Sequence, residues 1–252
     1  IKRRKNQLKS LIFELIAKFL PFALVPFITQ AFGPTKYTEY LFYESILFIF
    51  IMLFTFGQDA AISRSVLLHN KNNTIKVQNT AYSMTIFFGI LCCIFAFLLK
   101  QYLVAFVAFC AILISLCNMV SLVAIAKSDL KIYNMSRISN QVLALTLTIF
   151  CITLNSLNIQ LRIFFIFLGF LIALIILNKY LVKFSIKNIF IKSAARSYLF
   201  SVGFILFFMG LSHVVRLRID KVFFLDYMTN NIAANIGLAS IFLIAVAESI
   251  VT

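Results

Sequence analysis

The sequence predicts an all-α integral membrane protein with about eight transmembrane helices. Hydrophobic residues make up 62% of the 252 residues and charged residues only 12%, and the mean hydropathy is +1.01. Soluble domains carry about 25% charged residues, and disordered chains are far less apolar. The apolar residues are grouped in runs near the length of about 20 residues that crosses a hydrocarbon core. A multi-pass helical protein satisfies all three observations.

Eight apolar runs follow one another along the chain. They are Ser10–Phe32, Leu41–Ile62, Asn79–Leu99, Tyr102–Ala126, Met135–Asn155, Arg162–Val182, Tyr198–Leu225 and Ile236 onward. The eighth meets Thr252 early and is short for a span. The basic N-terminal segment leads directly into a long run without a small-residue cleavage site, so we expect a retained first helix, not a removed signal peptide.

The basic residues predict the orientation of these helices. Of the 23 Lys and Arg residues, sixteen precede the first run or lie in, or within three residues of, the gaps after the second, fourth and sixth runs. The other gaps hold one each: Lys36, Lys100 and Arg162. By the positive-inside rule, the N-terminus is expected in the cytoplasm, and these three residues are expected outside. The net charge of +15 forms no basic stripe interleaved with exposed aromatics, so no nucleic-acid partner is expected.

The sequence predicts no cofactor, no metal site and no enzyme activity. The five Cys lie inside apolar runs without CxxC or Cys/His spacing and are expected to be small buried hydrophobes. Seven Gly leave little material for a phosphate-binding loop, and no Ser/His/Asp arrangement is present. A membrane glycosyltransferase or polymerase remains a minor alternative, because the loops are too short and basic for that class.

Charged residues inside the runs are the candidate functional residues, because a charge at the bilayer centre costs roughly 2.5–3.5 kcal/mol on insertion scales. The main cluster, in the seventh run, is Arg216, Arg218, Asp220 and Lys221. Asp220, a candidate for ion coupling or charge pairing, offsets only one of three positive charges. Because Arg binds phosphate oxygens in a bidentate manner, the cluster predicts a diphosphate site. The alternative is snorkelling at the outer end of a helix.

Further charges in the first two runs are weaker candidates. Glu14 and Lys18 are four residues apart and share a helix face. We expect Lys18 to face the diphosphate site and Glu14 to form a charge pair with Lys18 or to take part in ion coupling. An ordinary salt bridge near the inner end of the helix is equally compatible. Asp59 is a candidate ion-coupling residue, or else an acid at a helix end. We expect Glu44 to be a solvated cap, and His213 to make an interhelical hydrogen bond or to add a donor to the cluster.

Spacing of the runs indicates an internal repeat. An offset of 195 residues places the first run on Ile205–Tyr227 and the second on the eighth run, without a gap. We therefore expect residues 1–192 to form a six-helix transmembrane lobe and residues 193–252 to form the first two helices of an incomplete second lobe. Six helices per copy make the repeat parallel, and such repeats place the substrate between the lobes.

Several motifs resemble one family of transporters. They are residues 19–29 (FLPFALVPFIT), Phe32-Gly-Pro with Tyr37 and Tyr40, Phe56-Gly with Arg64, residues 218–225 (RIDKVFFL), and Ile236-Gly-Leu-Ala. The chain resembles bacterial polysaccharide flippases, the O-antigen (Wzx-type) members of the multidrug/oligosaccharidyl-lipid/polysaccharide transporter superfamily. It departs from the family's pattern at Thr38, where Gly is usual. The family has 12 to 14 helices in two lobes, so the resemblance implies a chain truncated after the start of the second lobe.

This resemblance implies a function in surface polysaccharide and lipopolysaccharide synthesis. The expected activity is movement of undecaprenyl-diphosphate-linked oligosaccharide across the bacterial cytoplasmic (inner) membrane by alternating access around a cationic cavity. Expected partners are the lipid-linked oligosaccharide, membrane lipid and other membrane proteins of polysaccharide assembly. The alternative is an ion-coupled multidrug exporter of the same superfamily, which would favour an acidic cavity. A non-transporting scaffold is disfavoured by the charges inside the spans. Without an ATP site, energy would come from an ion gradient, the membrane potential or substrate supply.

Overall fold

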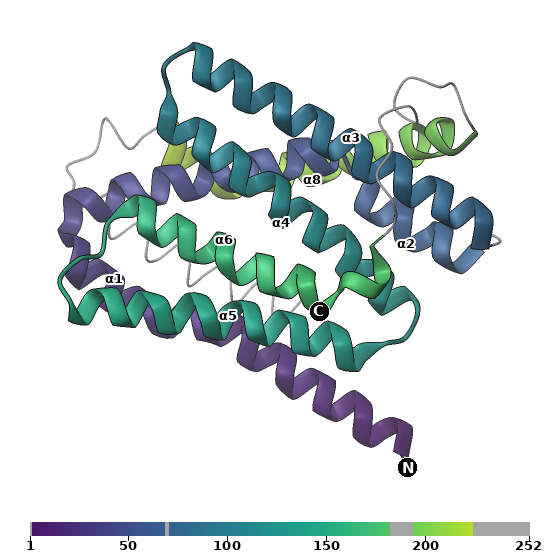
Figure 1. Ribbon diagram of the computed structural model, residues 1–252, viewed down its shortest axis with the longest axis horizontal. Coiled ribbons are helices and arrows are strands. Elements are labelled where there is room, and N and C mark those ends of the chain that lie inside the picture. Colours follow the sequence, from purple (N-terminus) through teal and green to yellow (C-terminus); the bar gives the residue numbers. More distant parts are fainter. Residues whose placement is uncertain (1, 69–70, 182–193, 224–252) are drawn as a thin grey trace.

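The computed structural model describes residues 2–68, 71–181 and 194–223, and side chains for most residues between 19 and 212 (Figure 1). Every regular element in these ranges is a helix. The elements are α1 (Lys2–Thr55), α2 (Gln58–Leu68), α3 (Lys71–Leu98), α4 (Tyr102–Ala126), α5 (Leu130–Thr153), α6 (Ile159–Ile176), the 3-10 turn η1 (Asn178–Tyr180) and α8 (Ala194–Phe223). Within the described residues, six helices are long and apolar enough to cross a membrane. The prediction of an all-α membrane protein is confirmed.

The first two predicted runs are joined more closely than expected. Both belong to α1, which is interrupted only at Gly33, with φ 70° and ψ 170°. Gly tolerates this left-handed φ, and the following proline favours an extended ψ at the residue before it. Pro34 then opens the second half of α1, as proline does at a first helical position. That half therefore begins near Pro34 and not at Leu41, and the expected loop around Lys36 is helical.

The inner end of the second run also differs from the prediction. Instead of continuing to Ile62, α1 ends at Thr55, and the chain turns through Phe56 (φ 45°) and Gly57 (φ 67°) before α2 begins. This break frees backbone carbonyls that a membrane helix must satisfy elsewhere. The Thr85 hydroxyl of α3 donates to the Phe54 carbonyl at 3.0 Å. We call Phe56 and Gly57 the elbow.

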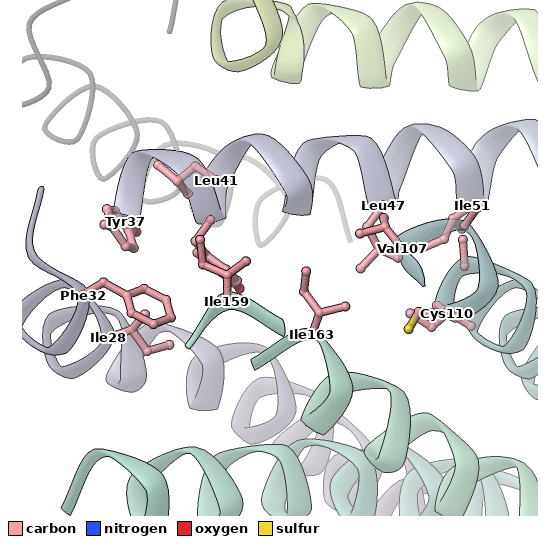
Figure 2. Packing of buried hydrophobic residues seen from close by; sticks show 14 of the residues in the cluster. Ile28, Phe32, Tyr37, Leu41, Leu47, Ile51, Val107, Cys110, Ile159 and Ile163 are labelled. Atoms are coloured by element: carbon pink, nitrogen blue, oxygen red, sulfur yellow. The ribbon is translucent and has the colours of Figure 1, made fainter. Parts of the chain in front are cut away.

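Two apolar clusters hold the helices together, and α4 contributes to both. In the first, Ile28 and Phe32 of α1 pack with Ile159 and Ile163 of α6, as Figure 2 shows, and the second half of α1 packs on α4. The second cluster joins α2, α3 and α4 to α6 and to Leu199 of α8. All five cysteines are free thiols, and each is buried or half-buried, in agreement with their expected role as apolar filling.

At one end of the bundle, the α4–α5 turn is fastened to η1. Asp129 caps α5 by accepting a hydrogen bond from the Ile132 amide at 3.4 Å. Its carboxylate also accepts hydrogen bonds from the Lys179 ammonium and, at 2.7 Å, from the Tyr180 hydroxyl. These bonds, that from Lys179 above all, hold the pKa of Asp129 below its ordinary value.

Candidate transport site

The helix that carries the predicted diphosphate cluster packs against the elbow. α8 contacts α1, α2 and α3 and lies behind them in Figure 1. At the point of closest approach, glycines face each other. A Cβ built on Gly57 would collide with the Gly203 carbonyl oxygen and lie 2.8 Å from the Phe207 amide nitrogen, and one built on Gly203 would lie 2.8 Å from the Phe56 carbonyl oxygen. Only two glycines permit this backbone approach.

Aromatic rings surround the glycine contact. The Phe56 ring stacks on Phe207 of α8, with centroids 4.5 Å apart and planes 26° apart. Phe200 and Phe204 of α8 also face Phe56, at centroid distances of 5.9 and 6.3 Å. Two residues before Phe200, the Tyr198 hydroxyl donates to the Ala61 carbonyl of α2 at 3.5 Å. The elbow is therefore enclosed by a single face of α8.

The cationic cluster lies further along the same helix. Residues 216–221 belong to α8, and Arg216 follows Gly203 by 13 residues, which is about 20 Å of helix. The side chains of Arg216, Arg218, Asp220 and Lys221, and that of His213, lie outside the described residues. The same holds for Glu14 and Lys18, which belong to the first half of α1. The predicted pairing of Lys18 with the cluster therefore stays a prediction.

Asp59 lies beside the elbow. The structure places it in the first turn of α2, where a carboxylate interacts favourably with the positive end of the helix dipole. The side chain is half-buried, and its backbone carbonyl accepts a hydrogen bond from the Ser63 hydroxyl at 3.2 Å. Asp59 thus lies in the first turn of a helix, beside the α8 contact. Its predicted ion-coupling role stays a prediction.

Arg162 corrects the expectation that it lies in an outer loop. Asn158 caps α6 by accepting a hydrogen bond from the Leu161 amide at 2.8 Å, so the helix begins before Arg162. The side chain is only 7% exposed, and Nη1 donates to the Thr148 hydroxyl of α5 at 3.0 Å. Within the described part of the chain, its buried Nε has no hydrogen-bond partner. An Asn four residues earlier, at a cap position, is the sequence signal that could have located it.

Glu44 is also less solvated than expected. It is half-buried on the second half of α1 and accepts a hydrogen bond at 2.8 Å from Tyr40, one turn earlier. Tyr40 is buried and lies within electrostatic reach of both Glu44 and Arg162. The described helices therefore enclose polar side chains where α1, α5 and α6 meet, which hydropathy alone does not indicate.

A second polar group lies between α2 and α3, next to the elbow. Among the described residues, three buried polar atoms have no hydrogen-bond partner there: Gln58 Oε1, Gln78 Nε2 and the Tyr82 hydroxyl. The Thr74 hydroxyl of α3 donates to the Ser65 carbonyl of α2 at 3.0 Å, which fixes these helices side by side. The elbow is thus flanked by uncharged polar groups on its α3 side and by aromatic rings on its α8 side.

Comparison with known proteins identifies the class to which this helical architecture belongs. Residues 4–247 match the family described as "Polysaccharide biosynthesis protein". The chain belongs to this family, so α8 and the elbow between α1 and α2 are parts of a multi-pass membrane protein of polysaccharide biosynthesis.

Two relatives from Haemophilus influenzae are similar to parts of the chain. One, named "Uncharacterized membrane protein", is 29% identical over 102 residues, which are 40% of this chain and 25% of the relative. The other, named "Lsg locus putative protein 1", is 31% identical over 85 residues, which are 34% of this chain and 21% of the relative. The matched region thus spans a quarter or less of these relatives. No solved structure matches the chain.

Proposed function

We propose that this protein moves a polyprenyl-diphosphate-linked oligosaccharide from the inner to the outer leaflet of the bacterial cytoplasmic membrane. Membership of the polysaccharide biosynthesis family over residues 4–247 carries the proposal. The apolar helices keep the protein in the bilayer, and the basic residues within the seventh run, Arg216, Arg218 and Lys221, favour an anionic substrate. Because its lipid tail stays in the bilayer, a lipid-linked sugar can be moved between leaflets only by a protein embedded in the membrane.

The proposed diphosphate site is the cluster on α8. Arg216, Arg218 and Lys221 bring three positive charges into one helix that also packs against the first lobe. Guanidinium groups stay charged at any relevant pH and bind phosphate oxygens through paired N–H donors. We place Lys18 on the opposite wall and assign Glu14, Asp59 and Asp220 to charge pairing or ion coupling. The N-terminus lies in the cytoplasm, because the sixteen basic residues flank that side.

The architecture supports two lobes that open alternately. We propose residues 1–192 as the first lobe and α8 as the opening helix of the second, in accordance with the repeat offset of 195 residues. An ion-coupled drug exporter of the same superfamily is the second candidate, favoured by the half-buried Asp59 and Glu44. It would bind organic cations, and the three positive charges on α8 oppose such a substrate.

Complementation in cells tests the proposal. A strain that lacks this protein should regain surface polysaccharide when the wild-type gene is supplied. Arg218→Ala should abolish this display at normal expression, and Arg218→Lys should restore it only in part because the bidentate contact is lost. Arg64→Ala, at an exposed position of α2, is the matched control and should complement fully. Full display with Arg218→Ala would remove this residue from the substrate site.

A further inference from the structure

The position of the elbow along the membrane normal gives the α8 contact a direction. From Pro34 to Gly57 the chain advances 23 residues, about 35 Å of helix, against a hydrocarbon core of about 30 Å. Gly33 and Gly57 thus lie at opposite ends of the second half of α1, and Gly57 is on the cytoplasmic side in the proposed orientation. Gly203 is nine residues into α8, about 14 Å from its start. The contact therefore lies between the cytoplasm and residues 216–221.

We propose that the contact of Phe56 and Gly57 with Gly203 and Phe207 is the cytoplasmic gate of the transport path, closed in this structure. The proposal rests on the proposed function, since a gate needs a path. In this proposal, a lipid-linked sugar that enters from the inner leaflet passes between the elbow and α8 on its way to residues 216–221. While the elbow touches α8, that route is shut on the cytoplasmic side.

The geometry of the contact suits a gate that opens as a unit. Phe56 has a positive φ, a sparsely populated conformation that persists only where the surroundings hold it. Those surroundings are the rings of Phe200, Phe204 and Phe207, all on α8. When α8 moves away, Phe56 loses these partners together, and the two glycine backbones separate at the same time. The ring contacts and the glycine contact would therefore form and break together, as expected of an element that switches between two arrangements.

Distances between spin labels test whether the contact opens. Labels at Arg64 on α2 and Ser197 on α8, both exposed, should give one short distance in the purified protein. Gly203→Ala should add a longer distance, because the new Cβ would lie 2.8 Å from the Phe56 carbonyl oxygen, a backbone atom that cannot rotate away. Phe56→Leu, which adds no volume, should shift the distances in the same direction.

The matched control is Gly210→Ala on the same helix. Its Cβ would meet only the terminal atoms of the Met52 side chain, which can move, so the distances should stay as in the wild type. Unchanged distances in both Gly203→Ala and Phe56→Leu would overturn the proposal. So would a shift in Gly210→Ala as large as that in Gly203→Ala, because the effect would then be general loosening of α8.

Cross-linking tests whether opening is needed for transport. In a cysteine-free background, a short bis-maleimide between Arg64→Cys and Ser197→Cys should abolish flipping of lipid-linked oligosaccharide in vesicles. The same reagent between Arg64→Cys and Ile75→Cys joins α2 to α3, which are held together by the Thr74–Ser65 bond, and should leave flipping intact. Flipping through the first cross-link would overturn the gate. If the distances respond as predicted but the wild-type protein does not flip this substrate, the proposed function fails, and the result shows only that the elbow and α8 can separate.

Discussion

Replacing Thr148 by valine should destabilise the protein through Arg162. The Arg162 side chain is 7% exposed, and the Thr148 hydroxyl is the hydrogen-bond acceptor recorded for its Nη1, at 3.0 Å. Valine keeps the volume and β-branching of threonine but removes the acceptor. Hydrogen bonds to charged groups contribute about 1.5–3 kcal/mol to stability. For a chain of this size, 1 kcal/mol shifts Tm by roughly 2–4 °C, so Thr148→Val should lower Tm by about 3–12 °C.

Two further variants make this prediction specific. Thr146→Val, at an exposed position of the same helix, removes only a bond to the Leu143 carbonyl and should change stability by less than about 0.5 kcal/mol. Arg162→Met in the Thr148→Val background should recover stability, because replacing a buried charge by an apolar side chain removes the desolvation cost. Thermal unfolding in one detergent measures all three. Equal melting of the Thr148 and Thr146 variants, or no recovery in the double variant, would refute the reasoning.

Three more predictions follow from the structure. Hydrogen bonds lower the pKa of Asp129, so the stability that its carboxylate contributes is present above the ordinary aspartate pKa and is lost as pH falls through the lowered value. The Tm difference between wild type and Asp129→Asn should therefore shrink on acidification. A Tm difference that is constant with pH would oppose this. Gly57→Ala should lower Tm more than Gly33→Ala, since both positions have positive φ but only Gly57 has backbone within 4 Å of the new Cβ; equal losses would argue against the close α8 contact. A cysteine at Lys100 should react with an impermeant thiol reagent added outside intact cells, and one at Lys131 should not. Labelling of position 131 would contradict the predicted orientation of the helices.

The helical class and most helix positions were predictable because hydropathy and span length are strongly constrained in a bilayer. The elbow was not predicted, because the run Leu41–Ile62 has the length of a single span, and hydropathy does not register a change of backbone direction. The continuity of α1 through Gly33 was likewise missed, since the polar residues around Lys36 resemble a loop although Pro34 can start a helix.

The candidate site was predictable only where charge interrupts an apolar run. This criterion selected the α8 cluster and Asp59 but misplaced Arg162, because a basic residue near the end of a run was counted with the loop. Its burial depends on the α6 cap at Asn158 and on the facing Thr148, which belongs to another helix. The usual family Gly at Thr38 proved unnecessary for the backbone here: Thr38 lies in regular helix, and its hydroxyl donates to the Pro34 carbonyl at 2.8 Å.

Leaflet assignment of a lipid-linked oligosaccharide tests the central claim most directly. The protein is reconstituted into vesicles that carry undecaprenyl-diphosphate-linked oligosaccharide, and an impermeant glycosidase removes the sugar exposed outside. The function proposed here predicts that further sugar becomes cleavable with time in vesicles with the wild-type protein, and not in protein-free vesicles or with Arg218→Ala. Cleavage confined to the initially exposed leaflet in all three, with export of a cationic dye by the wild type alone, would contradict it and identify a drug exporter.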